Sequence, residues 1–114
     1  MRAHYVGQDM KTTLVRAAPQ AGEPAEQCLL HTPNWDFGWQ RIHRFDTAIE
    51  DAVRFSTGDK FRLECTYNNT LANTAVATAL ADQGKTEPED VTIGDTTLDE
   101  MCLTVVGAAY RVAP

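Results

Sequence analysis

The stretch KFRLECTY, residues 60–67, decides the fold class of this chain of 114 residues. Apolar side chains alternate with polar ones along it, at Phe61, Leu63, Cys65 and Tyr67. A period of two is typical of a strand that buries one face and exposes the other to water. Turn-forming residues flank the stretch, with STGD before it and NN after it. The sequence therefore predicts a half-buried β-strand over residues 60–67.

Other segments also predict strands. The stretch TAIEDAVRF, residues 47–55, carries apolar residues on one face, and we expect it to form an antiparallel hairpin with residues 60–67. KTTLVRAA (11–18) and EQCLLHT (26–32) are predicted to form a second pair, joined by a loop that contains two prolines and a glycine. MCLTVVGAAYRV (101–112), rich in small and β-branched residues, is the predicted last strand.

One segment, NTAVATALADQG (73–84), fits either a helix or a strand. Its alanines and apolar spacing suit a short helix, while its valine and threonines suit a strand. We favour a strand or extended loop because the neighbouring segments are all β. Several short strands separated by turns then predict a single all-β domain spanning residues 1–114, an antiparallel β-sandwich of jelly-roll type.

Charge and hydropathy exclude two classes of partner. The net charge of −6 offers no basic stripe for a phosphate backbone, so we expect no nucleic acid binding. No apolar run is long enough to span a membrane, and the first residues lack the apolar core of a signal peptide. The three cysteines form no CxxC pair, which leaves one disulfide with a free thiol or three reduced thiols as alternatives.

Three stretches together carry a resemblance to a known family: HTPNWDFGWQ (31–40), GDKFRLECTYNNT (58–70) and GDTTLDEMC (94–102). In this order they resemble the C-terminal domain of the copper type II, ascorbate-dependent monooxygenases, the family of peptidylglycine hydroxylating monooxygenase and dopamine β-hydroxylase. The bacterial members are the most similar. The likeness extends from about His4 to Tyr110, with the first strands of the family domain lacking.

The resemblance implies a copper site in this chain. The family binds its oxygen-activating copper with an H-x-H pair and the methionine of an EMC motif, which correspond here to His4 and Met101. A thioether favours Cu(I), and imidazole accepts both copper oxidation states. The first histidine of the pair falls on Arg2, whose guanidinium stays protonated and cannot bind copper. Two of the three family ligands are therefore expected here.

The resemblance also implies a disulfide between Cys65 and Cys102, and hence an extracytoplasmic or secreted location if it forms. Cys28 would then be a free thiol, which we expect to be buried. His31 and His43 flank an aromatic cluster and match no copper ligand of the family, while Asp36 is expected to cap a turn.

Family members hydroxylate a C–H bond with O2, using ascorbate as reductant and two coppers in two domains. We expect this chain to be a partial or degenerate version that needs the missing N-terminal copper domain or a second chain, and to form a homodimer through exposed strands. Leu103 and Val105 replace the residues that hold the peptide carboxylate in the amidating members, so peptide amidation is disfavoured. The alternatives are a non-catalytic β-sandwich interaction module and a copper-binding module without oxygenase activity.

Overall fold

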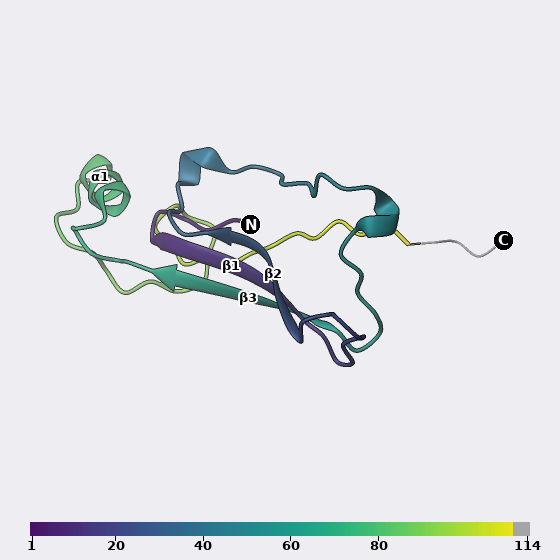
Figure 1. Cartoon of the computed structure of the whole chain (residues 1–114). Coiled ribbons are helices and arrows are strands. Elements are labelled where there is room, and N and C mark those ends of the chain that lie inside the picture. The colour runs from purple at the N-terminus through teal and green to yellow at the C-terminus, as the bar shows by residue number, and fades with distance from the viewer. Residues whose placement is uncertain (111–114) are drawn as a thin grey trace.

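A computed structural model describes residues 1–110 of the chain, which form one antiparallel sheet and one α-helix (Figure 1). The sheet contains β1 (Gly7–Val15), β2 (Glu26–Thr32) and β3 (Lys60–Tyr67), in the order β2-β1-β3. Two short 3-10 helices, η1 (Phe37–Trp39) and η2 (Ile49–Asp51), lie between β2 and β3. The fold of the described residues is therefore mainly β, with little helix.

The central strand β1 pairs with both of its neighbours. Its pairing with β2 runs from Met10 opposite Thr32 to Val15 opposite Glu26, and the register shifts between Thr12 and Thr13. This confirms the predicted pairing of the segments 11–18 and 26–32. The half-buried character of β3 is confirmed too, since its partly buried positions recur at every second residue from Leu63 to Tyr67.

The predicted hairpin between residues 47–55 and 60–67 is wrong. β3 pairs with β1 along its whole length, from Gly7 opposite Tyr67 to Val15 opposite Lys60. Residues 47–55 instead contain η2, where Glu50 and Asp51 follow Ile49 and interrupt the apolar alternation. The partner of β3 is thus distant in sequence, and a reading of adjacent segments could not find it.

The segment 73–84 is helical, and the prediction of a strand there is wrong. Helix α1 (Thr74–Asp82) begins after Asn73, whose side chain accepts a hydrogen bond from the backbone N–H of Ala75. The helix buries one face through Val76, Ala79 and Leu80, which recur at helical spacing. A good N-cap and a run of alanines therefore outweigh the β character of the neighbours.

The buried core is small and lies where α1 meets the first residues of the chain. Val6, Val76 and Leu80 form its centre, and four partly buried residues pack against them: Tyr5, Tyr67, Val91 and Leu98. Met10 is fully buried in β1, as expected for a core residue. Gly7 allows a close approach here, because a Cβ at this position would lie 2.7 Å from the Cβ of Ala3.

The predicted last strand is not present in the described part of its range. Residues 101–110 form a single bridge at Leu103 and are otherwise irregular and mostly exposed. Residues 111 and 112 of that prediction lie outside the described residues. A β-sandwich needs a second sheet, and residues 1–110 form only one.

Asp59 makes the turn before β3 sensitive to acid. Its carboxylate accepts hydrogen bonds from the backbone N–H groups of Ala17 and Ser56, each at 2.9 Å, and these bonds lower the pKa of Asp59 below its ordinary value of 3.8. Since the pKa is lower in the folded chain, the stabilisation is present above pH 3.8 and is lost as the pH falls through the folded value.

We therefore expect Asp59→Asn to flatten the loss of thermal stability between neutral and strongly acidic pH. The measurement is the melting temperature across that range, with Asp46→Asn as the control. Asp46 lies in an exposed stretch and accepts no hydrogen bond from the described residues. Equal acid dependence in the parent and Asp59→Asn would contradict the assignment.

Candidate metal centre

The N-terminal segment and the segment around Met101 run antiparallel beside the sheet. Arg2 and Leu103 form a bridge in which each backbone N–H donates to the other residue's carbonyl, at 2.7 and 3.0 Å. The register of this bridge does not continue along the two segments, because the backbone N–H of Tyr5 donates to the carbonyl of Thr97 at 3.1 Å. His4 contacts Asp99, two residues before Met101. The structure therefore places His4 and Met101 on adjacent segments.

His4 is held in a defined orientation. Its side chain is buried, with 5% of the residue exposed, and Nδ1 lies 3.2 Å from the backbone carbonyl oxygen of Asp99. A carbonyl only accepts hydrogen bonds, so Nδ1 carries the proton and the lone pair is left on Nε2. The ring also meets Phe37 edge to face, with centroids 6.1 Å apart. Histidines that bind metals commonly have one nitrogen fixed in this way.

The loop that supplies this carbonyl is fixed by the Asp99 side chain. Oδ2 of Asp99 accepts a hydrogen bond of 2.9 Å from the backbone N–H of Thr96. This bond lowers the pKa of Asp99, and the hydroxyl of Thr96 and the nearby His4 lower it further. A carboxylate ionised at neutral pH therefore stabilises the turn whose backbone orients His4.

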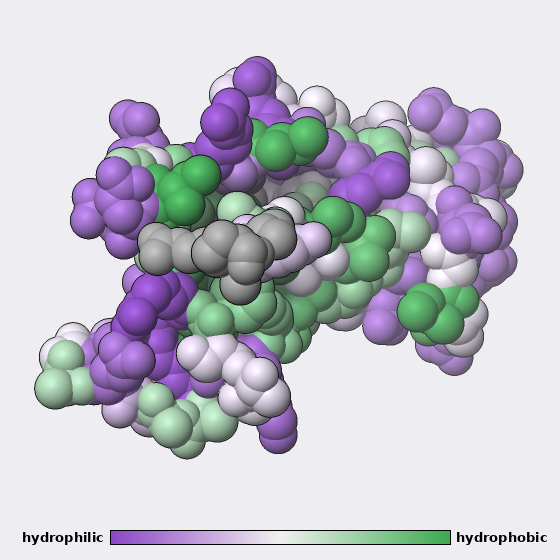
Figure 2. Space-filling view, turned by 90° about the vertical axis from the view of Figure 1, so that its right-hand side faces the viewer, coloured by the Kyte–Doolittle hydropathy of each residue, from purple (hydrophilic) through white to green (hydrophobic). Residues whose placement is uncertain are grey.

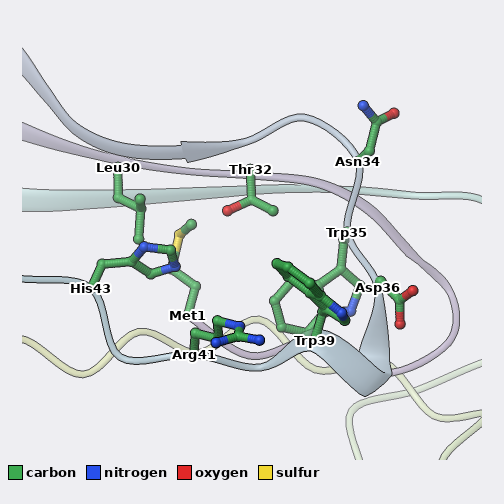
Figure 3. A pocket seen from close by; sticks show the side chains of 9 residues that line it. All are labelled: Met1, Leu30, Thr32, Asn34, Trp35, Asp36, Trp39, Arg41 and His43. Carbon is green, nitrogen blue, oxygen red and sulfur yellow. The ribbon is translucent and has the colours of Figure 1, made fainter.

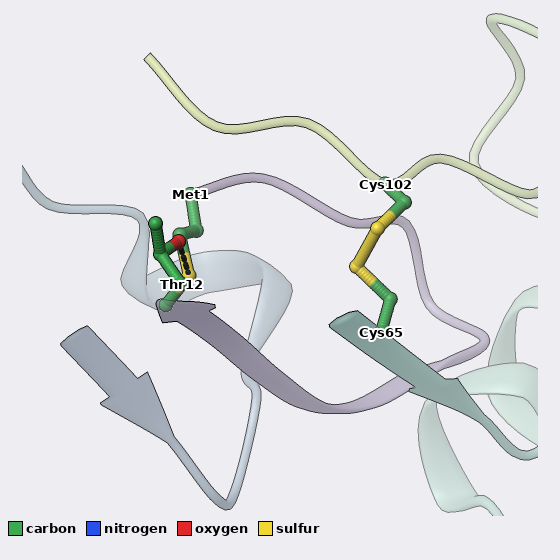
Figure 4. Close-up of a disulfide and its surroundings, with 4 residues drawn as sticks. All are labelled: Met1, Thr12, Cys65 and Cys102. Carbon is green, nitrogen blue, oxygen red and sulfur yellow. Dashed lines mark hydrogen bonds between the residues drawn. A yellow bond between two sulfur atoms is a disulfide. The ribbon is translucent and has the colours of Figure 1, made fainter. Parts of the chain in front are cut away.

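The disulfide between Cys65 and Cys102 forms as expected. The two Cα atoms are 6.0 Å apart, which is ordinary for this bond, and the residues are separated by 37 positions. Figure 4 shows the bond joining β3 to the irregular segment that contains Cys102. Met101 directly precedes Cys102, so the disulfide ties the methionine to the sheet.

Cys28 is exposed, which corrects the expectation of a buried thiol. It lies on the edge strand β2, whose outward-facing positions include Cys28 and His31. An edge strand over a small core leaves such positions open to water. His31 forms a hydrogen bond with Asp9, with Nε2 2.8 Å from Oδ2.

The number of donors at the candidate centre is small. Among residues 1–110, no group of three or more His, Cys, Asp or Glu side chains lies close enough to hold a metal ion. Arg2 contributes its backbone to the bridge with Leu103. The chain itself thus offers one imidazole and one thioether.

Nearby, burial and the charge of Glu100 raise the pKa of Tyr67.

A separate cavity of about 270 Å³ opens between β2 and η1 (Figure 3). Trp35 and Trp39 line it together with Met1, Arg41 and His43, and the guanidinium of Arg41 lies 4.3 Å from the centre of the Trp39 ring. Asp36 forms the predicted cap by accepting a 2.7 Å bond from the N–H of Gly38. His4 and Met101 do not line this cavity.

Comparison with known proteins gives no relative for this chain: no family model, curated protein or solved structure matches it. The disulfide is compatible with an extracellular location. Within residues 1–110, no helix is both long and apolar enough to cross a membrane.

The sequence could not indicate which groups support the site. The contact of the Asp99 carbonyl with His4 depends on backbone geometry that no motif encodes. Its one local signal is the spacing of Thr96 and Asp99, which is common in turns closed by an aspartate side chain.

Proposed function

We propose that this chain is a Cu(I)-binding β-domain similar to the oxygen-activating domain of ascorbate-dependent copper monooxygenases. His4 would bind through Nε2 and Met101 through its sulfur. The observation that carries the proposal is the disulfide at Cys102, which ties to the sheet the segment of Met101, and His4 contacts that same segment at Asp99. The fixed tautomer of His4 supports it as well. Imidazole and thioether together form a donor set suited to the reduced ion.

Copper in such a domain supplies the activation of O2 for hydroxylation of a C–H bond, with ascorbate as the reductant. The residues of this chain would hold the ion and keep the imidazole oriented. Two donors leave coordination positions open, so the domain would act as part of an assembly. An N-terminal copper domain or a second chain would supply the rest, including the second β layer of a jelly-roll sandwich.

A non-catalytic interaction module is the second candidate. The observation that favours it is the large exposed apolar surface among residues 39–55 and 103–110, which suits contact with another protein surface. This candidate requires no metal. The two candidate functions are distinguished by a copper-binding measurement, which shows whether His4 and Met101 determine copper affinity.

The test is an anaerobic titration with Cu(I) in the presence of a competing chelator. It uses a Cys28→Ser background, because the exposed thiol of Cys28 would itself bind Cu(I). We expect one equivalent to bind, and His4→Gln and Met101→Leu each to weaken binding at least tenfold. His43→Gln is the matched control for loss of a histidine and should leave the affinity unchanged. Equal affinity in all four proteins would reject the copper site and leave the interaction module.

A further inference from the structure

The described chain exposes far more surface than a compact monomer of its size. Its accessible surface is 8415 Å², whereas a folded chain of 12.6 kDa is expected to expose about 6,200 Å². Its radius of gyration is 17.8 Å, compared with about 13 Å for a compact domain of this length. The excess of about 2,200 Å² exceeds the roughly 800 Å² that each partner buries in a standard interface. The surface is therefore large enough for a stable dimer.

Every residue from 41 to 51 is exposed. We call residues 40–51, which follow η1 and include η2, the open segment. It runs alone beside the sheet in Figure 1. Three large apolar side chains on it are open to water, with exposed fractions of 95% for Ile42, 56% for Phe45 and 78% for Ile49. Figure 2 shows the end of the molecule where η2 lies, and exposed hydrophobic surface lies there next to hydrophilic surface.

The backbone of the open segment is available for pairing. Gln40 and Ala48, near its ends, are both extended, with φ and ψ of −70° and 118° and of −65° and 154°. Within the described chain, no backbone N–H or C=O of residues 40–47 forms a hydrogen bond. Extended backbone with a row of unpaired groups is a template for pairing with another strand.

The charges of the open segment are ordered along it. Its first half carries Arg41 and Arg44, and its second half carries three acidic residues: Asp46, Glu50 and Asp51. None of these five side chains forms an ion pair within residues 1–110. Two identical segments that run antiparallel place the basic half of each against the acidic half of the other. The segment is thus complementary to itself about a two-fold axis near Phe45.

We propose that the open segment is a homodimer interface, in which residues 43–47 of two copies pair as antiparallel strands around a two-fold axis near Phe45. Phe45 of one copy then lies beside Phe45 of the other, with the exposed Ile42 and Ile49 flanking this contact, and the opposite charges fix the register. This inference is independent of copper binding, since it uses neither His4 nor Met101.

The experiment compares two charge-reversal variants of the whole chain. One, Arg41→Glu with Arg44→Glu, makes the open segment wholly acidic, and the other, Asp46→Arg with Glu50→Arg, makes it more basic. We expect the parent to sediment at about twice 12.6 kDa and each variant to dissociate at least tenfold more readily. An equimolar mixture of the two variants should restore dimers, and native mass spectrometry should identify them as one copy of each.

The control, Lys60→Glu with Lys85→Glu, changes charge by the same amount outside the open segment and should remain dimeric. Circular dichroism of each variant would show that the fold is retained. A parent that stays monomeric at high concentration would overturn the proposal. It would also fail if both variants remained dimeric alone, or if their mixture remained monomeric.

Discussion

Replacing Cys65 and Cys102 together with alanine is expected to lower the free energy of unfolding by about 4 kcal/mol. The disulfide closes a span of 37 positions, and in the chain-entropy account a cross-link of that length removes about this much conformational freedom from the unfolded chain. The described core is small, so packing offsets little of this loss. The effect would be a large part of the total stability of a domain of this size.

The measurement is urea unfolding followed by the fluorescence of Trp35 and Trp39. Cys28→Ala is the matched control: it removes the exposed cysteine and should change the free energy by less than about 0.5 kcal/mol. A reducing agent should lower the stability of the parent to that of the double variant and leave the double variant unchanged. Equal midpoints for parent and double variant would show that the bond does not stabilise the fold.

Asn73→Ala is expected to destabilise the chain by about 3 kcal/mol, because one buried side chain loses three hydrogen bonds. Its Nδ2 donates to the carbonyl oxygens of Tyr5 at 2.7 Å and Asn68 at 2.9 Å, and its Oδ1 caps α1 through the N–H of Ala75. Asn73 therefore joins the N-terminal segment, the end of β3 and the helix. Without it, two carbonyls and one N–H in a partly buried place lose their partners.

Asn73→Asp separates the two roles of this side chain. A carboxylate can still cap the helix, but it cannot donate to the two carbonyls, so we expect it to be about as destabilising as alanine. Asn69→Ala is the control, since Asn69 is a partly buried neighbour with one side-chain hydrogen bond, which it donates to the carbonyl of Glu89. Chemical unfolding should give Asn73→Ala a much lower free energy of unfolding than Asn69→Ala. Similar losses for the two would mean that Asn73 has no special role.

The sequence predicted the strands whose side chains alternate and failed where pairing is non-local. The alternation of residues 60–67 and the pairing of residues 11–18 with 26–32 follow from local pattern and turn residues. The central place of β1 between β2 and β3 does not, because β3 could have paired with either flanking segment. The helical cap at Asn73 was a local signal that the sequence did carry, and the surrounding β segments led the interpretation away from it.

The candidate site was predicted in part. Cys65, Cys102, His4 and Met101 followed from the resemblance, and the structure confirms the disulfide. The exposure of Cys28 was missed because the side of an edge strand that faces water depends on where the sheet meets the small core. The orientation of His4 by the Asp99 carbonyl depends on a contact between residues 95 positions apart, which no local pattern specifies.

The most direct test of the central claim is X-ray absorption at the copper edge of the Cu(I)-loaded chain in the Cys28→Ser background. Our account predicts a sulfur neighbour and an imidazole neighbour of copper, with the sulfur signal lost in Met101→Leu and retained in His43→Gln. A spectrum with only nitrogen and oxygen neighbours, or a sulfur signal that persists in Met101→Leu, would contradict the assignment of Met101 and His4 as the copper ligands.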